Sequence, residues 1–107
     1  MSKAASLREL SDEQRAAALV KATAVRSARR VFKEKLTNGE MSLEKAISTA
    51  KADEALAGIR VRDLLQCLPG IGPKRAETAM EDIGISPARR IRGLGAHQVE
   101  ALIAREG

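Results

Sequence analysis

The chain has 107 residues, a formal net charge of +5 and a single aromatic residue, a phenylalanine. This length suits one domain, and a core built almost without aromatic residues favours packed helices over a β-sandwich. The single cysteine, Cys67, excludes an internal disulfide, and the lack of an apolar run of about 20 residues excludes a membrane-spanning helix. We therefore expect a soluble protein of the cytoplasm.

Residues 1–10 lack a helical period, so we expect a flexible tail before one domain that covers residues 11–107. Ser11 and Gln14 have the spacing of a capping box, and no Gly or Pro follows before Gly39, which predicts a long helix over residues 12–36. One side of this helix is apolar and is expected to pack on the rest of the domain: Val20, Ala24, Ala28, Val31 and Phe32. The other side carries a basic stripe, which is either a solvated face or a second surface for a polyanion: Arg15, Arg26, Arg29, Arg30 and Lys33.

The rest of the chain, residues 42–106, also reads as helical, with no segment that alternates like a strand. Ser42 caps a second helix, and Gly58 interrupts the pattern before a short helix over residues 61–67. Further helices are expected over residues 73–82 and 96–105, with a short helical turn that starts at Ser86-Pro87. The predicted fold is all-α, a long first helix packed on a compact helical core.

Two glycine turns each lead into a predicted helix, and basic residues lie near both turns. The first turn holds Gly70 and Gly72, and the second holds Gly93 and Gly95. Backbone N–H groups at a helix start bind anions, and glycine lets a phosphate come close to the backbone. The nearby cations are Lys74, Arg75, Arg89, Arg90 and Arg92. This arrangement suits the phosphates of a nucleic acid, and two simpler readings remain: an ordinary helix–helix turn, and arginines that pair with Glu81, Asp82 and Glu100.

The segment LPGIGPKRAE, which starts at Leu68, resembles the hairpin of helix-hairpin-helix and helix-two-turns-helix DNA-binding modules. The longer frame that ends in RRIRGLG, at residues 89–95, is similar to the actinobacterial integration host factors. EQRAAAL at residues 13–19 and the acidic second helix extend the similarity to most of the chain.

The resemblance implies a non-enzymatic, nucleoid-associated protein with a long helix packed on a helix-two-turns-helix domain. It implies binding of double-stranded DNA with little sequence preference, bending or compaction of that DNA, and support of site-specific recombination such as phage integration, with a phage integrase complex as a further partner. By motif, Arg89, Arg90 and Arg92 match arginines that meet the DNA backbone and minor groove, and residues 69–74 match the phosphate-holding turn. The basic stripe would then be the second DNA contact.

Two other functions compete with this interpretation. A small-subunit ribosomal protein shares the double-turn module, so an RNA-binding, ribosome-associated role is the alternative. DNA glycosylases also carry the hairpin, but they need a catalytic constellation and a base-sized pocket, and one His with one Cys supplies neither. We expect no enzyme activity, no metal, no cofactor, no membrane contact and a monomer in solution.

Overall fold

The computed structural model describes residues 11–107, so the tail expected over residues 1–10 lies outside the described part. Helix α2 covers Asp12–Thr37, close to the predicted bounds. The Ser11 hydroxyl accepts from Gln14 N at 3.1 Å, and Gln14 Oε1 accepts from Ser11 N at 2.9 Å. This capping box satisfies two of the N–H groups that a helix start leaves free. With 26 residues, α2 is about 39 Å long.

The other helices are shorter. They are α3 (Leu43–Ala52), α4 (Glu54–Ala57), α5 (Val61–Gln66), α6 (Pro73–Ile83), the 3-10 helix η1 (Ile91–Gly93) and α7 (Ala96–Glu106). The described residues contain no strand, only an isolated antiparallel bridge between Arg60 and Arg90. The all-α prediction is confirmed, while α4 was not predicted. A four-residue helix capped by its own Asp53 side chain is too short to produce a hydrophobic period.

The short turn of helix expected at Ser86-Pro87 is present only as a single hydrogen-bonded turn, and no helix forms there. These residues form a turn closed by Arg89 N donating to Ser86 O at 2.9 Å, and the backbone then becomes extended at Arg90. Extension is needed because this segment pairs with residues 59–61, and a helix there would remove its donors and acceptors from that pairing.

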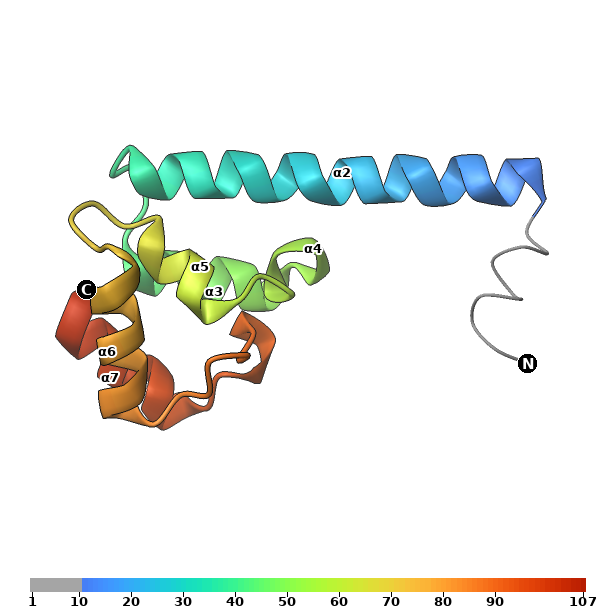
Figure 1. Cartoon of the computed structure of the whole chain (residues 1–107). Helices are drawn as coiled ribbons and strands as arrows, with labels where there is room; N and C mark the ends of the chain where they lie inside the picture. The colour runs from blue at the N-terminus through green and yellow to red at the C-terminus, as the bar shows by residue number, and fades with distance from the viewer. Residues whose placement is uncertain (1–10) are drawn as a thin grey trace.

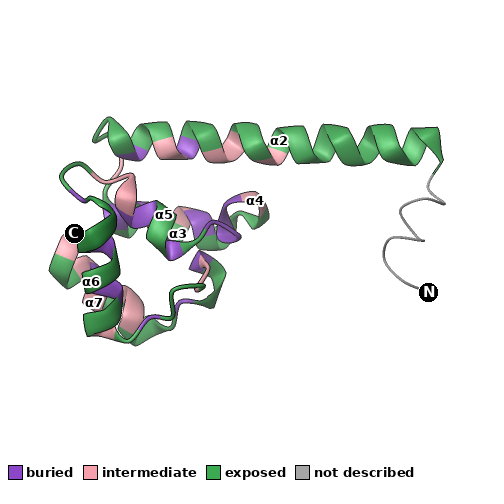
Figure 2. Ribbon diagram, viewed as in Figure 1, coloured by how far each residue is buried: buried purple, intermediate pink, exposed green. Residues whose placement is uncertain are grey.

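The core is formed by leucine, isoleucine and valine side chains from most helices. The largest fully buried side chains are Leu36, Ile47, Val61, Leu64, Leu65, Ile91 and Leu102. Helix α3 lies at the centre and packs against α4, η1 and α7. Figure 2 shows that buried residues lie on α3, α5 and α6 and on the loop that contains η1.

Helix α2 uses only its second half for packing. Residues 12–24 are all exposed, and the helix extends well beyond α4 (Figure 1). Phe32 and Leu36 are its buried residues, and Thr37 Oγ1 donates to Cys67 O at 3.2 Å. The predicted apolar side is therefore only partly right: Ala28 is half-buried, but Val20 and Val31 stay exposed. Within the described part, no helix is long and apolar enough to cross a membrane.

This packing predicts that two side-chain truncations on α2 lower the free energy of unfolding by unequal amounts. Phe32→Ala removes a side chain that is 4% exposed and should lower the free energy of unfolding by about 3–5 kcal/mol. Val20→Ala, at 70% exposure, should change it by less than about 0.5 kcal/mol. Urea unfolding followed by circular dichroism measures both. An equally large loss for Val20→Ala would mean that the first half of α2 packs against something in solution.

Candidate nucleic-acid interface

The arginine-rich loop is held by backbone pairing with the segment before α5. Val61 N donates to Arg89 O and Ile91 N donates to Ile59 O, both at 2.9 Å. Ile91, the residue between Arg90 and Arg92, has a fully buried side chain. Backbone pairing and a buried anchor therefore fix the loop, so its arginines start from a rigid backbone.

The three arginines of this loop have different surroundings. Arg90 Nη1 donates to Gly58 O at 2.5 Å, and Arg89 Nη1 donates to Gly93 O at 2.8 Å. Arg92 is exposed and forms no ion pair within residues 11–107. Arg89 and Arg90 therefore also brace the loop, whereas the whole Arg92 guanidinium can reach a ligand.

The simpler reading, in which these arginines pair with nearby acids, does not hold in the described part of the chain. Asp82 pairs with Arg105 at 2.8 Å. Glu81 and Glu100 form no ion pair with any described arginine. The positive charge of the loop is therefore not compensated by ion pairs.

Gly58 is the place where guanidinium groups from two parts of the chain meet. Arg29 of α2 donates from Nε to Ala55 O at 2.8 Å. A Cβ on Gly58 would lie 2.7 Å from Arg29 Nη2 and 4.0 Å from Arg92 Nη1, while Arg90 bonds the Gly58 carbonyl. We call Arg29, Arg90 and Arg92 the Gly58 cluster. It unites residues that sequence analysis had assigned to two separate surfaces.

Sequence reasoning missed Gly58 as a site residue and treated it only as an interruption of the helical pattern. Its φ of −81° is ordinary for any residue. The position requires glycine for space, since the Arg29 side chain occupies the place of a Cβ. No local sequence signal reports a contact between residues 29 positions apart.

The glycines of the two predicted turns are needed for different reasons, one for its backbone conformation and another because a neighbouring side chain occupies the place of a Cβ. Only Gly70 of the two predicted turns has a left-handed φ, at +82°. Gly93 admits the Arg89 side chain, whose Cδ would lie 3.0 Å from a Cβ there. Gly72 and Gly95 are the N-caps of α6 and α7, and neither helix start is capped by a serine, threonine or aspartate side chain, unlike those of α2, α3 and α4.

The two helix starts lie at opposite ends of the α6–α7 pair. Gln98 in the first turn of α7 donates to Gly84 O at the end of α6. Arg75 in the first turn of α6 pairs with Glu106 at the end of α7, with Nη2 to Oε2 at 2.9 Å. The starts are therefore separated by about the length of α6, roughly 15 Å. Lys74 is exposed beside the first start, but Arg75 is engaged by Glu106, whose side chain is only 3% exposed.

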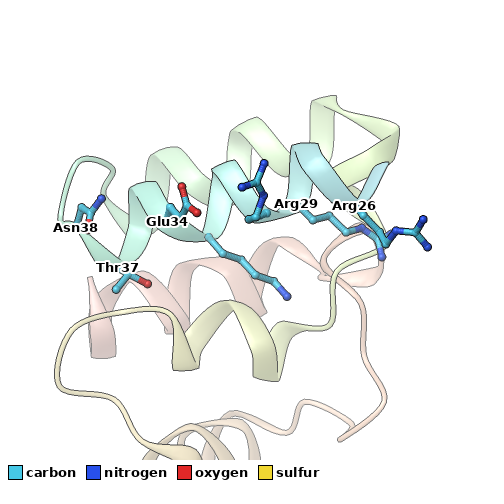
Figure 3. A pocket seen from close by; sticks show the side chains of 7 residues that line it. Arg26, Arg29, Glu34, Thr37 and Asn38 are labelled. Atoms are coloured by element: carbon cyan, nitrogen blue, oxygen red, sulfur yellow. The ribbon is translucent and has the colours of Figure 1, made fainter. Parts of the chain in front are cut away.

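The basic stripe on α2 borders a shallow hollow along the second half of the helix. Figure 3 shows Arg26 and Arg29 at one end of it, and Thr37 and Asn38 at the other. Arg30 and Lys33 also line this hollow, together with the acid Glu34. Arg15 lies further along α2, with Nη1 at 3.8 Å from Asp12 Oδ1. The stripe is continuous only from Arg26 to Lys33.

Cys67 offers no nucleophile at this surface. Partial burial raises the pKa of its thiol, and Asp63 raises it further against the opposing effect of Lys33. The thiol is therefore protonated at neutral pH, and protonated thiols are poor nucleophiles. Within residues 11–107, no three side chains of the metal-binding types come together.

Comparisons with known proteins place the chain in a family. A model of the S13-like H2TH domain matches residues 36–105. Integration host factor of Mycobacterium tuberculosis is 44% identical over 101 residues, which span 94% of this chain and 96% of the relative. Integration host factor of Streptomyces coelicolor is 43% identical over 93 residues, which span 87% of each protein.

A solved structure has the same fold. The structure of sIHF bound to an 8 bp palindromic DNA aligns with a TM-score of 0.78 and 38% identity, over 81% of this chain and 98% of that one. The resemblance found in the segment Leu68–Gly95 is thereby confirmed over nearly the whole sequence. The chain belongs to the actinobacterial integration host factor family and carries its S13-like H2TH domain.

Proposed function

We propose that this protein is a non-enzymatic architectural protein of the nucleoid that binds duplex DNA through the Gly58 cluster and the arginine loop. The observation that carries the proposal is the uncompensated positive charge of Arg29, Arg90 and Arg92 around one glycine. Like charges gather at this density where an anionic partner neutralises them. The related sIHF, bound to DNA, supports a duplex as that partner.

The loop arginines supply the central contact in this proposal. Arg92 meets a phosphate or the minor-groove wall, where arginine is favoured because the potential is most negative. Arg89 and Arg90 hold the loop and lend their remaining donors to the same stretch of backbone. Gly93 contributes by admitting Arg89 beside the loop.

The helix starts at Gly72 and Gly95 add phosphate contacts, with Lys74 beside the first. Since they are roughly 15 Å apart, they do not hold successive phosphates. One strand carries one phosphate per about 3.4 Å of duplex axis, so the two starts reach phosphates several nucleotides apart. Arg75 serves mainly to hold α7 against α6, and the α2 residues Arg15, Arg26, Arg30 and Lys33 form a second DNA contact.

Sequence preference is expected to be weak. The groups named reach phosphates and groove walls, and they do not place a set of asparagine, glutamine and arginine side chains on one helix for reading base edges. Contacts from α2 and from the loop to one duplex would bend it by neutralising one side. We further propose that bending compacts DNA and assists site-specific recombination, including assembly with a phage integrase, and that each copy binds as a monomer.

An RNA-binding role remains the second candidate, because the matching family model is that of an S13-like domain. A labelled duplex DNA and an RNA hairpin of equal charge should be compared in one anisotropy assay. The proposal expects tighter binding to the duplex DNA. Preference for the RNA hairpin would favour the ribosome-associated alternative.

Arg92→Gln should weaken duplex binding and make its salt dependence less steep, reducing the magnitude of d log K/d log[salt] by about one unit, because one phosphate contact is lost. Arg105→Gln removes the same charge from a residue paired with Asp82, and it should leave the slope unchanged. Salt-titrated fluorescence anisotropy measures both, with circular dichroism to confirm folding. Equal effects of the two variants would reject the loop as the contact.

Bending is testable by end-to-end energy transfer on a duplex of about 30 base pairs labelled at both ends. We expect transfer efficiency to rise on saturation with the wild-type protein. A variant with Arg26, Arg30 and Lys33 all changed to Gln should still bind but bend less, since the second contact is weakened. Unchanged transfer on saturation with wild type would mean that the protein binds DNA without bending it.

A further inference from the structure

A second hollow lies where α2, α4 and the arginine loop meet. Its lining includes Lys21 and Arg29 from α2, Glu54 and Gly58 from the α4 region, and Arg92 from η1. Two of these cations come from the long helix and one from the loop, so the hollow spans parts of the chain that are far apart in sequence. It is distinct from the hollow of Figure 3, although Arg29 borders both.

The charge balance of this hollow is strongly positive. Lys21, Arg29 and Arg92 contribute three cations against the single carboxylate of Glu54, and Glu54 forms no ion pair with any described cation. Arginine cannot lose its proton to relieve the repulsion. An anion placed between the three cations would relieve it.

Hydrogen bonds to backbone carbonyls orient the guanidinium groups at this hollow before an anion binds. Arg29 uses its Nε to bond Ala55 O, which orients the guanidinium and leaves its terminal Nη donors for a ligand. Arg90 donates a hydrogen bond to the carbonyl oxygen of Gly58. Gly58 is also the residue at which a Cβ would clash with the Arg29 side chain. A guanidinium fixed in advance loses less entropy when it binds an oxyanion.

We propose that this hollow binds one phosphate group through Lys21, Arg29 and Arg92, and that the phosphate ties α2 to the arginine loop. The inference rests on the proposed function for the source of the phosphate, which is then a phosphodiester of duplex DNA. A free polyphosphate presents the same tetrahedral oxyanion. Arg29 thereby belongs to the primary site, and α2 takes part in the main contact as well as in the second one.

Gly58 gives the sharpest test, because an alanine there fits the backbone but displaces Arg29. Its φ and ψ of −81° and −5° suit alanine, and the clashing atom is the far end of the Arg29 side chain. Gly58→Ala should therefore keep the fold while moving the guanidinium. Circular dichroism and the unfolding midpoint check that the variant is native.

The first arm of the experiment titrates tripolyphosphate into the full chain by isothermal calorimetry, with sodium chloride matched for ionic strength. Arg29→Gln and Gly58→Ala should each weaken binding by about tenfold, as expected for loss of a charge-assisted hydrogen bond. Glu54→Gln should tighten binding, because it removes the only acid. Lys35→Gln, on another face of α2, should change the affinity by less than about twofold, because screening weakens the effect of a distant charge.

The second arm repeats the same variants on labelled duplex DNA. Arg29→Gln should reduce the magnitude of the salt slope by about one unit, and Arg29→Lys should restore most of that magnitude. If wild type binds DNA and Arg29→Gln behaves like Lys35→Gln in both arms, the hollow is not the phosphate site and Arg29 is not part of the interface, while DNA binding through the arginine loop stands. If wild type binds tripolyphosphate with these effects but not DNA, the hollow stands and the proposed function fails.

Discussion

The short pairing between residues 59–61 and residues 89–91 sets the position of the loop arginines in the candidate interface. Two backbone hydrogen bonds of 2.9 Å and the buried Ile91 side chain hold the loop against the start of α5. Gly58 lies immediately before this pairing, so the same contact that anchors the loop also brings Arg90 and Arg92 to the glycine. Helix α2 then places Arg29 on the other side. Without this pairing the arginines would be a mobile stretch of charge.

The structure separates arginines that hold the fold from arginines that remain available. Arg75 and Arg105 contact Glu106, and Arg105 also pairs with Asp82, so both stabilise the packing of α7 on α6. Arg92 has no such partner in the described part of the chain, and Arg29 and Arg90 bond only backbone carbonyls. A carbonyl orients a guanidinium without cancelling its charge. Net charge alone would not reveal this division, because all five residues count equally in the sum.

Much of the fold could be predicted from the sequence because its signals are local. Ser11 and Gln14 mark the start of α2, Ser42 caps α3, Pro73 begins α6, and Gly84 ends α6 with a φ of +85°. The errors arose where distant contacts decide the outcome. The turn at Ser86-Pro87 is set by pairing with residues 59–61, and the exposure of Val20 depends on how far the other helices reach.

The interface was predictable as a list of residue types but not as a geometry. Arg89, Arg90 and Arg92 stand out in the sequence, and the resemblance of their motif assigned them a role. Three features of the geometry depend on contacts between residues about 30 positions apart or more. They are the position of Arg29 beside the loop arginines, the need for a glycine at position 58, and the ion pair of Arg75 with Glu106. The periodic spacing of apolar residues along a helix does not report such contacts.

The most direct test of the account is to follow the guanidinium Nη–H signals of the arginines by NMR while an unlabelled DNA duplex is added. The account predicts that the signals of Arg29 and Arg92 shift most, because their guanidiniums meet a phosphate. The signals of Arg75 and Arg105 should stay near their positions, because Glu106 and Asp82 already hold them. Large shifts at Arg75 and Arg105, with Arg29 and Arg92 unchanged, would contradict the claim that the Gly58 cluster is the DNA-binding site.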